Sequence, residues 1–291
     1  MSASDPFYED IIAAARRGDL RRAARMAEAA ASLIHRDAIA AMALANVRGG
    51  IAFERGQLEL AEACFEQVLR LASERADSQM VAKATSNLGS VAHLRGKGML
   101  AVTLYLSALE AYRDGRNARG EAQAEHNLGV VRRSLGEFDA AQLAADRAVA
   151  AARRAGDRGL LGLALAGAAE AAIERGALSR ARRLLVEARG LARSAGDQLG
   201  LVEVRRLQAL LAYRLRRYAV ALRHASAAYL QAIRLGSPQL CGECAVLSAQ
   251  ASAGLQQRRL AEGFRSRAQQ CFRSLGAVAA LRRLALLAPS T

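Results

Sequence analysis

The sequence predicts an all-α protein built from about seven helix-turn-helix units that follow one another along the chain, with a short helix after the last. Three observations lead to this class. Strong helix formers such as Ala, Leu, Arg and Glu dominate, whereas the 291 residues contain only three prolines and no tryptophan. Glycine and alanine recur at a fixed period of about forty residues, and helix-capping residues recur at the same period. Such a period is the signature of stacked repeats.

The first periodic signal lies in the first helix of each unit and in the turn that follows it. Asn87-Leu88-Gly89 and Asn127-Leu128-Gly129 lie forty residues apart, and a further glycine comes seven residues after each. The turn positions are Gly18, Gly56, Gly96, Gly136 and Gly176, then Arg216 and Gln256 in the last two units. Five residues after each turn position stand Ala23, Ala61, Ala101, Ala141, Ala181, Ala221 and Ala261. An alanine kept at one position of every unit predicts a close helix crossing.

The second periodic signal marks where each unit begins. Asp37, Asp77, Asn117, Asp157, Asp197 and Ser237 are residues that cap helix N-termini, and Gly156, Gly196, Gly236 and Gly276 stand at the end of the preceding helix. Asp5 and Pro6 form a similar start for the first unit. We therefore expect one domain with units at about 5–36, 37–76, 77–116, 117–156, 157–196, 197–236 and 237–276, and a capping helix at 277–288.

These motifs resemble the tetratricopeptide repeat (TPR) family, whose signature includes the Leu-Gly pair, the glycine at the turn and the alanine of the second helix. The forty-residue period is similar to the branch that contains kinesin light chains, the Leu-Gly-Asn polarity adaptors and bacterial peptide-sensing regulators. The resemblance implies a right-handed α-solenoid. The chain departs from the signature in lacking its first-helix Trp and Tyr, and the fifth to seventh units have Ala168-Ala169, Gln208-Ala209 and Ser248-Ala249 in place of Leu-Gly.

The resemblance also implies a function: a non-enzymatic scaffold or adaptor that binds another protein or a peptide in a concave groove lined by the first helices. Transferred position by position, the groove residues are Lys83, Asn87, Ser90, His93, Gln123, His126, Asn127, Arg133, Arg206 and Tyr213. Asn87 and Asn127 are the leading candidates, because an amide offers the donor and the acceptor that one peptide unit requires. The alternative is that these amides bond within their own helices or to the neighbouring turn.

Charge is unevenly distributed along the chain. Residues 1–145 hold 18 basic and 18 acidic residues, whereas residues 146–291 hold 24 and 9, so the net charge of +15 comes from the second half. Arg180, Arg182, Arg183, Arg214, Arg216 and Arg217 are expected to form a basic patch. Forty of the 42 basic residues are arginine, which a GC-rich coding sequence would explain, but such a bias does not explain the loss of acids. The charge favours an acidic partner; the alternative is a nucleic acid or an anionic surface.

Nothing in the sequence predicts catalysis or a cofactor. Cys241 and Cys244 have the spacing of a metal or redox pair, but no second Cys or His pair accompanies them, so packing is the favoured interpretation. The sequence shows no Ser-His-Asp set, carboxylate pair or glycine-rich phosphate loop. It also shows no secretory signal and no uncharged apolar run of about 18 residues, so a cytoplasmic location with reduced thiols is expected.

Overall fold

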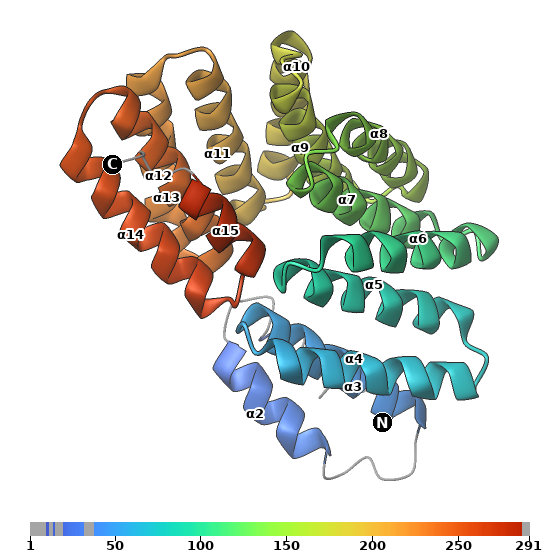
Figure 1. Ribbon diagram of the computed structural model, residues 1–291. Coiled ribbons are helices and arrows are strands. Elements are labelled where there is room, and N and C mark those ends of the chain that lie inside the picture. Colours follow the sequence, from blue (N-terminus) through green and yellow to red (C-terminus); the bar gives the residue numbers. More distant parts are fainter. Residues whose placement is uncertain (1–9, 12–13, 15–19, 32–37, 287–291) are drawn as a thin grey trace. The chain divides into compact units, whose positions relative to one another are not determined.

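A computed structural model describes residues 10–11, 14, 20–31 and 38–286, and these residues form helices joined by short turns, without a strand among them (Figure 1). The all-α repeat class is therefore confirmed. Asp5, Pro6, Gly18 and Asp37, which we expected at helix starts and at a turn, lie outside the described residues, as do the last two residues of the expected capping helix.

The chain divides into two compact units, Met1–Gly115 and Arg116–Thr291, which we call unit 1 and unit 2. Unit 1 contains α2 (Leu20–Ala31), α3 (Ala38–Glu54), α4 (Leu58–Glu74), α5 (Ser78–Leu94) and α6 (Gly98–Asp114). Unit 2 contains α7 (Ala118–Ser134), α8 (Phe138–Ala155), α9 (Arg158–Glu174), α10 (Leu178–Ser194), α11 (Gln198–Arg214), α12 (Tyr218–Arg234), α13 (Pro238–Gly254), α14 (Arg258–Ser274) and α15 (Val278–Leu286). The division falls where the third expected repeat meets the fourth, and a single domain stays a prediction.

The turns inside the second to seventh repeats close in the same way. At Gly96 the backbone is left-handed, with φ of +77°; its N–H donates to the carbonyl of His93, and the N–H of Lys97 donates to the carbonyl of Ala92 (2.9 Å each). These bonds satisfy the last carbonyls of α5. Gly56, Gly136 and Gly176 are also left-handed, as are Arg216 (φ +56°) and Gln256 (φ +61°). The expectation that the last two replace the turn glycine is confirmed.

The helix starts are confirmed at the five caps that the structure describes. Asp77 accepts a hydrogen bond from the N–H of Met80 at 3.0 Å, and Asn117 accepts one from Gly120 at 2.8 Å. Asp157, Asp197 and Ser237 cap α9, α11 and α13 in the same way. Each cap pairs one of the free N–H groups in a first turn, so the start of each of these helices is determined locally.

Small residues allow the two helices of a repeat to pack closely. A Cβ at Gly89 of α5 would lie 3.0 Å from the ring of Tyr105 of α6, and a Cβ at Gly49 of α3 would lie 2.5 Å from the ring of Phe65 of α4. The recurring alanines are buried at every position from Ala23 to Ala221, whereas Ala261, in the last long helix, is only half-buried. The close crossings expected from the alanine period are therefore present in the stack, and they are less enclosed at its end.

Arg216 carries a Cβ in a left-handed turn, a conformation that costs a non-glycine residue about 1 kcal/mol or more. We expect Arg216→Gly to raise the free energy of unfolding of unit 2 by roughly 0.5 kcal/mol, because relief of this strain exceeds the extra entropy of an unfolded glycine. Thermal unfolding of the purified chain measures the change. Arg216→Ala is the matched control, because it removes the same side chain and keeps the Cβ. An equal gain in both variants would contradict the strain argument.

Candidate functional site

The first helices of the repeats in unit 2 form a continuous row. Helix α9 contacts both α7 and α11, and α13 in turn contacts α11. Each of these helices starts at a capping residue and ends at a left-handed turn, so the repeats present equivalent positions of their first helices side by side. Polar residues at these positions can therefore meet although they lie far apart in sequence.

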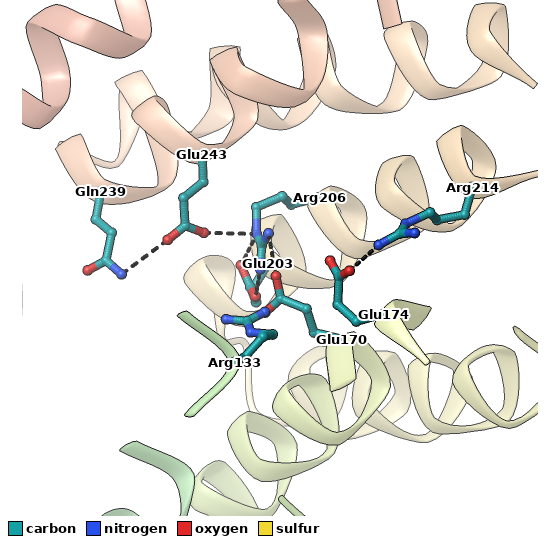
Figure 2. A network of polar contacts seen from close by, with 8 residues as sticks. All are labelled: Arg133, Glu170, Glu174, Glu203, Arg206, Arg214, Gln239 and Glu243. Atoms are coloured by element: carbon teal, nitrogen blue, oxygen red, sulfur yellow. Dashed lines mark hydrogen bonds and ion pairs between the residues drawn. The ribbon is translucent and has the colours of Figure 1, made fainter. Parts of the chain in front are cut away.

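Arg206 of α11 is the centre of a polar network in this row (Figure 2). Its side chain is only 7% exposed, yet three carboxylates surround it. The Nε and Nη2 atoms donate to Glu203 at 2.8 and 2.6 Å, and Nη1 donates to Glu170 of α9 at 3.0 Å. Glu243 of α13 lies 3.1 Å from Nε. A fork of N–H donors matches several carboxylates at once, which a lysine could not do.

The network extends from Arg206 toward the helices on either side. Glu170 also forms an ion pair with Arg133 of α7, and Gln239 of α13 donates to Glu243 at 3.2 Å. The exposed fraction of the side chains rises from 12% at Glu170 to 31% at Glu243. The polar face of these four helices, defined by His126, Arg133, Glu170, Glu203, Arg206 and Glu243, is called the first-helix face below.

The electrostatics of the network follow from its burial. Burial alone would raise the pKa of Glu170, but the guanidinium groups of Arg133 and Arg206 outweigh it and hold that pKa well below its usual range. Burial would lower the pKa of Arg206, and the three carboxylates instead raise it. Burial and repulsion from Glu203 and Glu170 raise the pKa of Glu243 in spite of Arg206. Glu243 therefore takes up a proton at a higher pH than Glu170 does.

His126 of α7 lies beside the network and packs against a neighbouring helix. A Cβ at Gly167 of α9 would lie 2.9 Å from its Nδ1 atom. Burial, with the charge of Arg133, lowers the pKa of His126 to about 4, against the opposing effects of Glu203 and Glu170. The imidazole is therefore neutral at pH 7, and it contributes a hydrogen-bonding ring to the face without a charge.

The structure places the other groove candidates of unit 2 on the same helices. Gln123 is exposed, and its Nε2 donates to the Oδ1 atom of Asn127 at 3.2 Å within α7. Tyr213 of α11 stacks at a tilt on Tyr218 of α12, with ring centroids 5.6 Å apart. Arg133 and Arg206 are joined in one network through Glu170, and His126 lies beside it, whereas Tyr213 contacts a residue of its own repeat.

The candidates of unit 1 lie on α5. Asn87 donates from Nδ2 to the Oδ1 atom of Asn46 on α3 at 3.1 Å, so two successive first helices are joined by an amide pair. The hydroxyl of Ser90 lies 2.8 Å from the hydroxyl of Tyr105, on the side that faces α6. Lys83 is exposed and His93 is half-buried. Bonding within the same helix therefore occurs at Asn127, through Gln123, and at Ser90, whose hydroxyl also lies 3.4 Å from the carbonyl of Ser86, whereas Asn87 bonds to a different repeat.

Sequence reasoning did not select Glu243, although a signal was available. Glu243 lies forty residues after Glu203, at the same position of the next repeat, and both carboxylates bind the same guanidinium. Because equivalent positions of neighbouring first helices lie side by side, two acids at this spacing predict a shared cation.

The basic charge is found mainly on the second helices. Within unit 2, the first helices α7, α9, α11 and α13 hold seven arginines and six acidic residues, whereas the second helices α8, α10, α12 and α14 hold 15 and 4. In the expected basic patch, Arg180 pairs with Asp146 and Arg214 pairs with Glu174. Arg182, Arg183, Arg216 and Arg217 are exposed. The net charge of these four first helices is thus close to zero.

The cysteines are packed among apolar side chains. Cys241 and Cys244 lie in a cluster with Val202, Ala228 and Ala232. Burial, with a smaller effect of Cys271, raises the pKa of Cys241 to about 11, and burial also raises the pKa of Cys244. Thiols held in the protonated form are poor ligands and poor nucleophiles. Across the described ranges, no group of three or more His, Cys, Asp or Glu side chains could hold a metal ion.

No helix among residues 10–286 that the structure describes is both long and apolar enough to cross a membrane. The cytoplasmic location stays a prediction.

The geometry defines a helical repeat protein with a polar face along the first helices of its repeats. Residues 39–114 and 80–154 match the family model of the tetratricopeptide repeat. The chain carries tetratricopeptide repeats in the second to fourth expected units, and the helices that follow keep the same period of turns and caps, so the fold as a whole is of the tetratricopeptide type. No curated protein sequence matches the chain.

Several solved structures are similar to this fold. A Rap protein complexed with competence and sporulation factor is 15% identical, with a TM-score of 0.82 over 92% of this chain and 74% of that chain. Aspartyl phosphate phosphatase F from Bacillus subtilis is 13% identical, with a TM-score of 0.73 over 88% and 66%. The Rap conjugation gene regulator of the plasmid pLS20, in complex with the Phr* peptide, is 14% identical, with a TM-score of 0.58 over 88% and 78%. At these identities the similarity establishes the fold.

The burial of Arg206 makes the network sensitive to the loss of one member. We expect Arg206→Met to destabilise unit 2 by about 3 kcal/mol, because the carboxylates of Glu170, Glu203 and Glu243 would be left close together with too little positive charge. Hydrogen exchange of the amides in α9, α11 and α13 measures the change, and α3 to α5 of unit 1 serve as the internal control. Adding Glu243→Gln should recover part of the loss. Protection unchanged by Arg206→Met would contradict the central role of Arg206.

The opposite pKa shifts of Glu170 and Glu243 predict opposite effects on acid stability. A lowered folded-state pKa stabilises the protein above the unfolded value of about 4.3, and this stability is lost progressively as the pH falls below about 5 and through the lowered pKa. Glu170→Gln should therefore flatten the decline of stability over this range. Glu243→Gln should steepen it, because the folded state loses a group that takes up a proton readily. Urea unfolding of each variant and of the unchanged chain at several pH values measures how steeply the free energy of unfolding of unit 2 falls with pH. If both substitutions changed this steepness in the same direction, the assignment would be contradicted.

Proposed function

We propose that this chain is a non-enzymatic scaffold or adaptor that binds a segment of another protein, or a peptide, along the first helices of its repeats. The fold supports the proposal, because repeat proteins of this type present a row of helices as an extended binding surface. Two of the structurally similar proteins are described in complex with competence and sporulation factor and with the Phr* peptide, respectively. A third similar protein is named as a phosphatase, and that activity is stated of that protein alone.

The observation that carries the proposal is the bonding of the two asparagines. Asn127 uses its Oδ1 atom for Gln123, and Asn87 uses its Nδ2 atom for Asn46. The other polar atom of each amide, Nδ2 of Asn127 and Oδ1 of Asn87, has no hydrogen bond to a described residue. The internal bonds orient the amides, and the remaining atoms can bond to the backbone of an extended peptide. Oriented polar groups of this kind favour recognition more than they favour stability.

We also propose that the bound segment of the partner is acidic. The +15 net charge supports it, since unit 2 contains 28 arginines and 13 acidic residues, whereas unit 1 contains 14 basic and 14 acidic residues. The first helices of unit 2 contribute little of this excess, because most of the arginines stand on the second helices. The alternative is a nucleic acid or another anionic surface bound by the same arginines without sequence preference.

A selected peptide tests the first-helix proposal. Random 12-residue peptides displayed on phage would be selected on the full chain, and the affinity of a synthetic winner would be measured by fluorescence anisotropy. Asn127→Ala and Asn87→Ala are examined singly. We expect whichever amide contacts the peptide to weaken binding about tenfold when it is replaced, because a lost hydrogen bond with a desolvated partner costs about 1–2 kcal/mol.

Gln269→Ala and Gln270→Ala are the matched controls, because they remove exposed amides from the second helix α14. Circular dichroism would verify that each variant keeps its helicity. If neither asparagine variant weakens binding although both stay folded, the assignment of the site to the first helices is wrong. Failure to select any peptide above background would count against peptide binding as such.

A further inference from the structure

A row of exposed arginines follows one side of α10. Arg182, Val186, Arg189 and Arg193 are all exposed, and they are spaced by four, three and four residues. This spacing places them along one side of a helix. Val186 is 68% exposed in the middle of the row. Three guanidinium groups and one aliphatic side chain are thus presented together on a second helix.

Two arginines from the next two helices lie close to this row. Arg205 of α11 donates from Nη1 to Oε1 of Gln231 on α12 at 2.9 Å, and Arg223 of α12 is exposed. Helix α11 packs against both α10 and α12, so these two arginines stand on helices next to the row. In agreement with this packing, burial and the charges of Arg223, Arg205 and Arg189 together lower the pKa of His224, the neighbour of Arg223. Guanidinium groups from three consecutive helices therefore lie within electrostatic range of one imidazole. We call the set Arg182, Val186, Arg189, Arg193, Arg205 and Arg223 the arginine surface.

The arginine surface lacks counterions. Within the described part of the chain, none of its five arginines forms an ion pair, whereas nearby Arg153, Arg180 and Arg214 pair with Glu187, Asp146 and Glu174, respectively. Positive charges that are gathered without acids raise the local potential and attract an anionic partner. The arrangement differs from the first-helix face, where nearly every cation has a carboxylate.

Exposed aliphatic side chains accompany these arginines. Leu230 of α12 is 56% exposed and lies seven residues after Arg223, on the same side of the helix, and Ile233 is 50% exposed one turn further. An acidic protein segment with aliphatic side chains would cover both the charges and this apolar area. A nucleic acid backbone would leave the apolar area uncovered, and the arginine surface contains no aromatic side chain on which bases could stack.

We propose that the arginine surface is a second binding site, separate from the first-helix face, for an acidic protein segment that carries aliphatic side chains. It lies mainly on the second helices α10 and α12, so the ligand of the first helices need not be displaced. The proposal does not require the first-helix site to exist, and each site has its own variants. A failure of one proposal is therefore distinguishable from a failure of the other.

The test uses the full chain and fluorescein-labelled probes. One probe is a helical peptide of about 20 residues rich in Glu and Leu, a second has Gln in place of every Glu, and a third is a random DNA duplex of about 20 base pairs. Fluorescence anisotropy at about 50 mM and about 200 mM salt gives the affinities. The acidic peptide should bind, more weakly at the higher salt, and the Gln peptide should not bind.

Two triple variants separate the surface from net charge. Arg189→Gln, Arg205→Gln and Arg223→Gln together should weaken binding of the acidic peptide at least about tenfold, which corresponds to loss of several charge contacts. Arg258→Gln, Arg259→Gln and Arg273→Gln together remove the same charge from exposed positions of α14 and should change binding less than about twofold. Equal losses in both variants would show that only net charge matters, and would overturn the proposal.

A further pair of substitutions distinguishes the kind of partner. Val186→Ser with Leu230→Ser should weaken the acidic peptide several-fold and leave the duplex unaffected, because only the peptide has aliphatic side chains to bury. If the duplex binds as tightly as the acidic peptide, with the same dependence on Arg189, Arg205 and Arg223, the partner is a nucleic acid and the proposed protein partner is wrong. Absence of binding by the acidic peptide at about 50 mM salt would also overturn the proposal.

Discussion

The structure depends on the fact that one pair of helices cannot bury its own apolar side chains. In unit 2, Leu165 and Ile173 of α9 pack in one cluster with Leu185 of α10 and Leu207 of α11, so α9 needs both its partner and the next repeat. Stacking is therefore obligatory. It succeeds only if successive helices meet at nearly the same angle, and the regular caps, left-handed turns and small residues provide that regularity.

Stacking also explains why charged side chains are buried in the row of first helices. When α9 and α13 pack on either side of α11, they remove Arg206 from water, and a guanidinium in that position is tolerated only with carboxylates around it. Glu170, Glu203 and Glu243 meet this requirement from three helices. The network consequently ties neighbouring repeats together by directional bonds, and it orients polar groups on the face where we propose that a peptide binds.

The two sets of helices in unit 2 differ in chemistry. The first helices carry nearly balanced charge in paired form, which suits recognition by hydrogen bonds, whereas the second helices carry most of the arginines together with exposed aliphatic side chains. Both properties arise from the same repeat. The first helix packs between the first helices of the neighbouring repeats, so its charged side chains are buried, whereas the second helix leaves most of its charged side chains in water. Under the two proposals, one chain could hold two partners at once.

The sequence by itself determined the period, the helix boundaries and the turns, down to Arg216 in the place of a glycine, because caps and left-handed turns are made by residues within a few positions of each other. It also indicated which helices carry the polar face, and the bond from Gln123 to Asn127 is local enough to be read from spacing. Only the tertiary structure decided the partners of Arg206, the pairing of Asn87 with Asn46, and the gathering of Arg189, Arg205 and Arg223. These contacts join different repeats, so they depend on how the helices pack and on which charges lose their water.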